Sequence, residues 1–170
     1  YKAKLRKEAL KEEVNSTVSK LRKATDTREA LALFREHSRE ELQSDLDFTA
    51  EVFGKAVNGF MNENLRELRK VLTAVEEKKI HLKQVKRVGT LDIAVEKGLY
   101  YYQGNDFASE IIFSIRRLAE PMKDHIDNNF SPLSPVQKDD FGKVSEQIIS
   151  FLRNCAIMIR KNDYIGFEEQ

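Results

Sequence analysis

Glycine and proline are scarce in this sequence. Only 7 of the 170 residues are glycine and 3 are proline, about half the usual share of these two residue types. Sheet sandwiches and barrels need many turns, in which glycine and proline are common, and collagen-like or low-complexity chains are rich in both. The scarcity therefore argues against these classes and favours a mostly helical protein.

Long apolar runs, a charge excess and paired cysteines are also missing. No run approaches the roughly 18 apolar residues that span a bilayer. The 29 basic and 28 acidic residues give a net charge of +1, which argues against nucleic acid as the main partner, because phosphate contacts need a basic excess. The single cysteine, Cys155, excludes an internal disulfide and indicates a reducing compartment. Its apolar neighbours predict a buried, inert thiol.

What the sequence does contain is helical spacing of apolar residues over most of its length. The hydrophobic share is 41%, which can support the core of one domain of this size. The 3.6-residue period predicts a broken helix over 76–98 and continuous helices over 2–24, 26–42, 44–75, 105–129 and 134–159. The expected fold is an all-α antiparallel helical bundle of about five helices.

Local signals indicate where some of these helices begin and bend. Ser44 can cap the helix that follows it. The sequence Ser-Pro-Val-Gln at 134–137 is a stronger start signal, with serine at the cap, proline at the first helical position and glutamine three residues after the serine. Gly54 and Gly59 predict the close approach of a neighbour, and Pro121 should kink or loosen a turn.

Signatures of nucleotide binding and of catalysis are missing from the sequence. There is no Gly-x-x-x-x-Gly-Lys, no Gly-x-Gly-x-x-Gly after a strand and no His-Glu-x-x-His. The three histidines, His37, His81 and His125, lie on different expected helices. Ser109 and Ser114 lie near acidic residues but near no histidine at a suitable spacing. A covalent catalytic mechanism therefore has no support.

Acidic side chains gather on one face of the helix expected over 105–129. At 100° per residue, a sector of roughly 80° holds Asp106, Glu110, Arg117, Glu120, Asp124 and Asn128. Carboxylates one turn apart, with an asparagine oxygen one turn further, can chelate a cation. Alternatively the face is solvated and its charges pair locally, for instance Arg117 with Glu120. His125 lies on the apolar side, which predicts a packed core histidine.

The stretch Leu-Ala-Glu-Pro-Met-Lys-Asp-His-Ile-Asp-Asn at 118–128 resembles the central motif of the PhoU-like family. That motif is a helix that carries Glu-x-x-x-Asp, commonly followed by histidine and then by asparagine. Glu120, Asp124, His125 and Asn128 each fall on a matching position.

The wider run 104–163 is similar to the PhoU-like cytoplasmic domain of bacterial sodium/phosphate and related inorganic-phosphate transporters. Residues 45–104 match loosely, and 1–44 match nothing in the family, which divides the chain into a basic N-terminal helical arm (1–44) and a PhoU-like bundle (45–170). The resemblance implies a regulatory domain, not an enzyme, at the cytoplasmic side of the inner membrane. Its partner would be the transmembrane part of the same longer chain, and assembly into a homo-oligomer is left open.

The resemblance also implies a bound divalent or trivalent metal ion, with Glu120, Asp124 and Asn128 as its ligands. The sequence departs from the family pattern in two ways. Pro121 lies inside the motif, and only one good copy is present where the family places two copies on facing helices. The best candidates for the second copy are two acidic pairs: Asp47 with Glu51, and Asp139 with Asp140.

A small metal-dependent helical enzyme is the alternative. It would use four carboxylates of one helix, those of Asp106, Glu110, Glu120 and Asp124. A di-iron enzyme of this type carries Glu-x-x-His pairs, and the sequence has none. This absence favours the regulatory domain.

The N-terminal segment is strongly basic. Residues 2–24 hold eight basic and three acidic side chains. The chain begins with Tyr1 rather than Met, so we expect it to be a piece of a longer protein. Basic residues cluster near the cytoplasmic ends of membrane helices and are attracted by anionic lipids. We therefore expect residues 1–24 to continue from a membrane helix and to hold the bundle against an anionic membrane surface; a free helix kept soluble by its charges is the alternative.

Overall fold

The computed structural model describes residues 27–89 and 95–161. In these ranges the chain forms four α-helices and no strand, which confirms the predicted all-α class. The helices are α2 (Thr27–Met61), α3 (Leu65–Gly89), α4 (Val95–Asp127) and α5 (Pro135–Lys161). None of these four is both long and apolar enough to cross a membrane. The helix expected over 2–24 lies outside the described residues.

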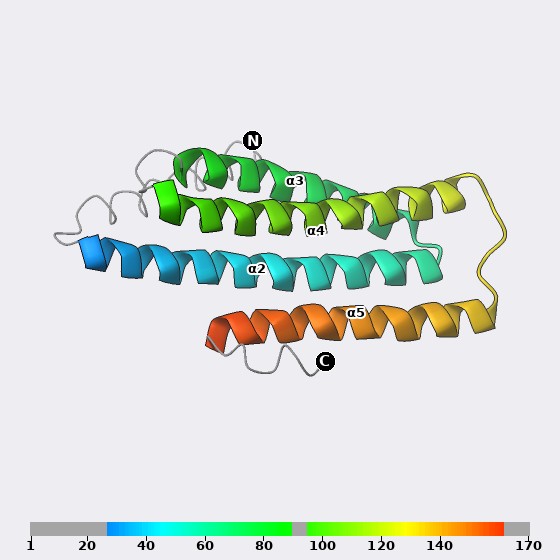
Figure 1. Ribbon diagram of the computed structural model, residues 1–170. Coiled ribbons are helices and arrows are strands. Elements are labelled where there is room, and N and C mark those ends of the chain that lie inside the picture. Colours follow the sequence, from blue (N-terminus) through cyan, green and yellow to red (C-terminus); the bar gives the residue numbers. More distant parts are fainter. Residues whose placement is uncertain (1–26, 90–94, 162–170) are drawn as a thin grey trace.

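Helix α2 is the centre of the arrangement. Helices α3, α4 and α5 each pack against α2, and α3 also packs against α4. Among the described helices, α5 has α2 as its only neighbour. In Figure 1, α5 lies below α2 while α3 and α4 lie above it, and the colours run in alternating directions along successive helices. Among the four described helices, α5 is therefore the one that packs on one side only.

The hydrophobic core has two parts. The larger part joins α2, α3 and α4, and its buried residues include Phe53, Ala56, Leu68, Val71, Ile112 and Ala119. The smaller part joins α2 to α5 and contains Leu46, Ala50, Leu152 and Ala156. Ile111 of α4 also packs against this smaller cluster.

Two glycines of α2 lie where neighbouring helices come close, as the sequence predicts. A Cβ built on Gly54 would be 3.3 Å from Cδ1 of Ile149 on α5, and one built on Gly59 would be 3.3 Å from Cγ of Leu68 on α3. The missing side chains let both neighbours approach, at a cost of up to about 1 kcal/mol each in helix propensity.

Helix α2 is continuous, and the helix boundary expected at Ser44, the last residue of the expected arm, is wrong. The apolar face of α2 continues through Leu46 against α5, so burial outweighs the capping preference of serine. The helix expected to follow is instead divided at residues 62–64. The signal for this division was Asn64, whose Oδ1 accepts a hydrogen bond from the Glu67 backbone N–H at 3.1 Å and caps α3.

Helix α4 is longer than expected. The sequence predicts a helix end near Gly98, but α4 begins at Val95 and continues through Gly98 and Gly104. An interior glycine costs about 1 kcal/mol relative to alanine, and the packing of α4 against two neighbours outweighs this cost. Pro121 also lies inside the helix without ending it.

The start of α5 is confirmed in detail. The Ser134 backbone N–H donates to Oε1 of Gln137 at 2.9 Å, and the Gln137 backbone N–H donates to Oγ of Ser134 at 3.3 Å. Pro135 is the first helical residue. These two reciprocal hydrogen bonds form the predicted capping box.

Candidate functional site

Glu120 and Asp124, the first two predicted metal ligands, lie one turn apart on an exposed face of α4. Oε1 of Glu120 accepts a hydrogen bond from Nε of Arg116 at 2.8 Å, and this hydrogen bond raises the pKa of Arg116. The same guanidinium reaches Glu76 of α3 at 3.1 Å. Oδ1 of Asp124 lies 3.0 Å from Nζ of Lys123. Each carboxylate thus already has a cationic partner within the chain.

Asn128, the third predicted ligand, uses its amide within the helix end. Its Nδ2 donates to the backbone carbonyl of Asp124 at 2.8 Å. The neighbouring Asp127 lies 2.7 Å from Nζ of Lys123, and the hydrogen bond from Lys123 lowers the pKa of Asp127. Lys123 therefore bridges two carboxylates of this turn.

The acidic face of α4 pairs its charges locally, as the solvated-face interpretation predicts. The partners differ from the expected ones, because Glu120 pairs with Arg116 while Arg117 lies 3.7 Å from Glu110. These pairs are exposed, and such pairs are worth little in stability.

The predicted ligands do not by themselves complete a metal site. Glu120 and Asp124 come from α4 and Asn128 directly follows its last residue, whereas hard cations take about six oxygen ligands. One carboxylate of each candidate second pair already has a cationic partner on its own helix, since Glu51 pairs with Lys55 along α2 and Asp139 with Lys143 along α5. Within the described ranges, no group of three or more His, Cys, Asp or Glu could hold an ion. The ligand set Glu120, Asp124 and Asn128 stays a prediction.

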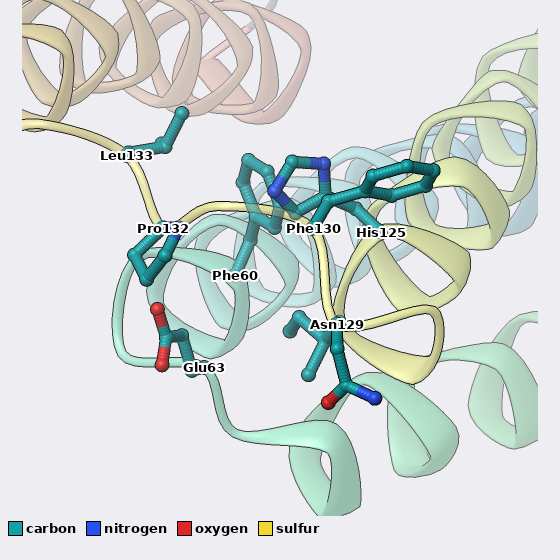
Figure 2. A pocket seen from close by; sticks show the side chains of 8 residues that line it. Phe60, Glu63, His125, Asn129, Phe130, Pro132 and Leu133 are labelled. Atoms are coloured by element: carbon teal, nitrogen blue, oxygen red, sulfur yellow. The ribbon is translucent and has the colours of Figure 1, made fainter.

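His125 lies away from the acidic face, in an aromatic cluster at one end of the bundle. Its ring meets that of Phe60 edge-on with centroids 5.4 Å apart, and the Phe130 ring lies at the same distance. Nε2 lies 3.0 Å from the Ser131 carbonyl oxygen. Figure 2 shows the imidazole between the two phenyl rings. The ring is packed, as predicted, but His125 is only partly buried and lies at the end of the bundle rather than in its core. Its hydrogen bond ties the α4–α5 loop to α4.

The C-terminus of α4 closes this cluster with a left-handed turn. The Phe130 N–H donates to the His125 carbonyl at 3.1 Å, and the Asn129 N–H donates to the Ile126 carbonyl at 3.0 Å. Asn129 has φ of 54°. This is a Schellman motif, and the contact between the rings of His125 and Phe130 is the apolar contact that commonly accompanies it.

Helix α2 ends in the same way at the same end of the bundle. The Asn64 N–H donates to the Gly59 carbonyl at 2.7 Å, and Glu63 has φ of 54°. A cavity of about 270 Å³ lies between the two helix ends and is lined by Phe60, Glu63, His125, Ile126, Asn129, Phe130, Pro132 and Leu133 (Figure 2). Two of its polar lining residues, Glu63 and Asn129, occupy the left-handed positions of the two turns. We therefore interpret the cavity as a consequence of two similar helix ends lying side by side.

A buried ion pair links α2 to α3, and the sequence analysis missed it. Asp45 is only 3% exposed, and its Oδ1 lies 2.5 Å from Nζ of Lys78. Burial raises the pKa of the Asp45 carboxyl, and the hydrogen bond and charge of Lys78 act in the opposite direction. Helical spacing could have indicated that Asp45 is buried. Asp45 precedes the buried Thr49 and Val52 by four and seven residues, which places it on the same face of α2.

Three of the five exposed large apolar residues of α5 lie in one row along the helix. Val144, Ile148 and Phe151 are 53%, 41% and 50% exposed, and the partly buried Cys155 and Met158 continue the row. We call these five residues the α5 stripe. Apolar spacing alone does not separate the buried from the exposed positions of this helix, whose buried residues are Ser145, Leu152 and Ala156. The apolar arc of α5 is therefore wider than α2 alone can cover.

The single cysteine belongs to this stripe. Cys155 is partly buried, and burial raises the pKa of its thiol. A raised pKa keeps the thiol protonated at neutral pH, which agrees with the predicted inert character. Burial is less complete than predicted, because part of the side chain stays accessible.

Helix α4 also carries exposed apolar side chains. Phe107 and Leu118 are exposed, and Ile111, four residues after Phe107, packs in the cluster that contains Leu152 of α5. Because residues four and seven apart share a face of a helix, Phe107 and Leu118 lie on the same face of α4 as Ile111.

Comparisons of this chain with models of protein families, with curated proteins and with solved structures found no match.

Proposed function

We propose that this chain is a non-catalytic helical domain that regulates a phosphate transporter through protein contacts. The observation that carries the proposal is the α5 stripe, which leaves a row of large apolar side chains exposed on a helix with a single described neighbour. Isolated apolar residues are normal on a protein surface, whereas a contiguous apolar patch marks an interaction site. Residues at helical spacing are also how an amphipathic helix presents anchors to a partner.

The phosphate-transport part of the proposal is supported by the resemblance of 118–128 to the PhoU-like motif. In this proposal the domain lies at the cytoplasmic side of the inner membrane and is attached to the transmembrane part of a longer chain. The acidic face that carries Glu120 and Asp124 is solvated, while His125 of the same motif packs the end of the bundle.

A chromosomal substitution in the cell that encodes the chain tests this proposal. Ile148→Glu places a charge in the α5 stripe, and we expect it to change the rate of radiolabelled phosphate uptake. Ile157→Glu is the matched control, because Ile157 is an exposed apolar residue of the same helix, 39% exposed, that lies outside the stripe. The proposal fails if both variants fold, by circular dichroism, and both take up phosphate at the parent rate.

If Ile148→Glu prevents folding, Val144→Glu provides the same test. Val144 is more exposed than Ile148, so a charge there disturbs the packing on α2 less. A change of uptake with a folded Val144→Glu protein supports the proposal, and unchanged uptake contradicts it.

A further inference from the structure

The α5 stripe repeats with the spacing of a coiled-coil seam. Val144, Ile148, Phe151, Cys155 and Met158 follow one another at intervals of four, three, four and three residues. A period of 3.5 residues keeps one row of side chains turned toward one partner helix. Helix α5 has 27 residues, which gives it a length of about 40 Å. The stripe is thus a long, regular surface for a second helix.

The residues that flank the stripe differ on its two sides. On the side toward α2, which we call the inner border, residues seven apart are packed: Ser145 and Leu152 are buried, and Ile159 lies against the cluster shared with α2. We call the opposite side the outer border. On the outer border, every seventh residue is polar and exposed: Asp140, Gln147, Asn154 and Lys161. Only the outer border is available to pair with polar residues of a partner helix.

The outer border is complementary to itself when a second α5 runs in the opposite direction. That pairing sets Asp140 against Lys161 of the partner subunit and Gln147 against Asn154 of the partner subunit, each twice by two-fold symmetry. An acid then meets a base, an amide meets an amide, and the opposed helix dipoles attract. A parallel pair would place this outer border against the partner's inner border, which is already packed on α2.

We propose that the α5 stripe binds a second copy of this chain, with the two α5 helices antiparallel about a two-fold axis near their middle. The inference deepens the proposed function by naming the partner of the surface on which that function rests. In this pair Val144 faces Cys155 of the partner subunit, and Ile148 faces Phe151 of the partner subunit.

Disulfide trapping in the full chain tests both the partner and the direction of pairing. The substitution Val144→Cys places a thiol opposite the native Cys155 of the other copy. Under mild oxidation we expect this variant to shift from the monomer mass to the dimer mass on a non-reducing gel, through two symmetric bridges. Within one copy, positions 144 and 155 are about 16 Å apart along the helix, which is too far for a disulfide.

Two controls make the result decisive. The parent chain, with Cys155 alone, should stay at the monomer mass, because antiparallel pairing separates the two native thiols. Ile157→Cys, outside the stripe, should also stay monomeric. Rapid cross-linking of the parent would indicate parallel pairing and overturn the proposal. A Val144→Cys variant that cross-links no faster than Ile157→Cys would overturn it too, and would leave the stripe to a different protein or to another segment of the same chain. Because the readout is mass and not phosphate uptake, this inference and the proposed function can fail separately.

Discussion

Glu63 and Asn129 have the same left-handed backbone conformation, with φ of 54° in both, at the ends of two helices that border one cavity. A Schellman turn requires this conformation at the residue after the helix. A residue with a Cβ is disfavoured there by roughly 1–2 kcal/mol, and asparagine is a partial exception. The two turns therefore have the same backbone geometry, but the strain is greater at Glu63 than at Asn129.

Glycine at these positions should relieve the strain unequally. We expect Glu63→Gly to raise the free energy of unfolding by about 1 kcal/mol, because glycine adopts positive φ without a steric cost. Asn129→Gly should raise it by less, since asparagine tolerates this conformation. Urea denaturation of both variants measures the difference, and an equal or reversed effect would contradict this account of the two turns.

The buried Asp45 predicts a pH dependence. Its pKa is raised above the unfolded value of 3.8, so the folded chain binds this proton more readily than the unfolded chain does. The stability from this group is complete below the unfolded pKa and is lost as the pH rises through the folded pKa. We therefore expect the parent to gain stability relative to Asp45→Asn as the pH falls from about 7 toward about 4. Denaturation of both proteins at several pH values checks this, and a difference that is constant or of the opposite sign refutes it.

Two substitutions of Ser134 measure how much the capping box contributes to the stability of the start of α5. Ser134→Ala removes the oxygen that accepts from the Gln137 N–H and should cost about 1 kcal/mol of stability, whereas Ser134→Gly should cost only a few tenths. Thermal denaturation followed by circular dichroism compares the two variants. Equal losses would show that the serine hydroxyl contributes nothing at this helix start.

The features predicted correctly depend on residues close together in the chain. Ser134 and Gln137 signal the start of α5 through contacts three residues apart, and the period of 3.6 indicates every described helix. The errors at Ser44 and Gly98 arose because packing between helices decided those positions. Leu46 packs against α5, a contact that local propensity does not contain, and the burial of such residues outweighs a weak break signal.

The candidate site was predicted less completely for the same reason. Helical spacing placed Glu120 and Asp124 on one exposed face, but it could not identify Arg116 as the cation that contacts both Glu120 and Glu76 of another helix. Spacing also could not show that Ile148 is exposed, because a single sequence does not reveal that α5 has only one described neighbour. The exposed stripe became visible only once the helices were placed.

Sedimentation equilibrium of the full chain tests most directly the central claim, that the α5 stripe binds a second copy. The account predicts a mass twice the 19.7 kDa of the chain for the parent and for Ile157→Glu, and a single-chain mass for Ile148→Glu, in which charges would be buried between two apolar helices without partners. A parent that sediments as one chain at all concentrations, or an Ile148→Glu variant that remains as dimeric as the parent, would contradict it.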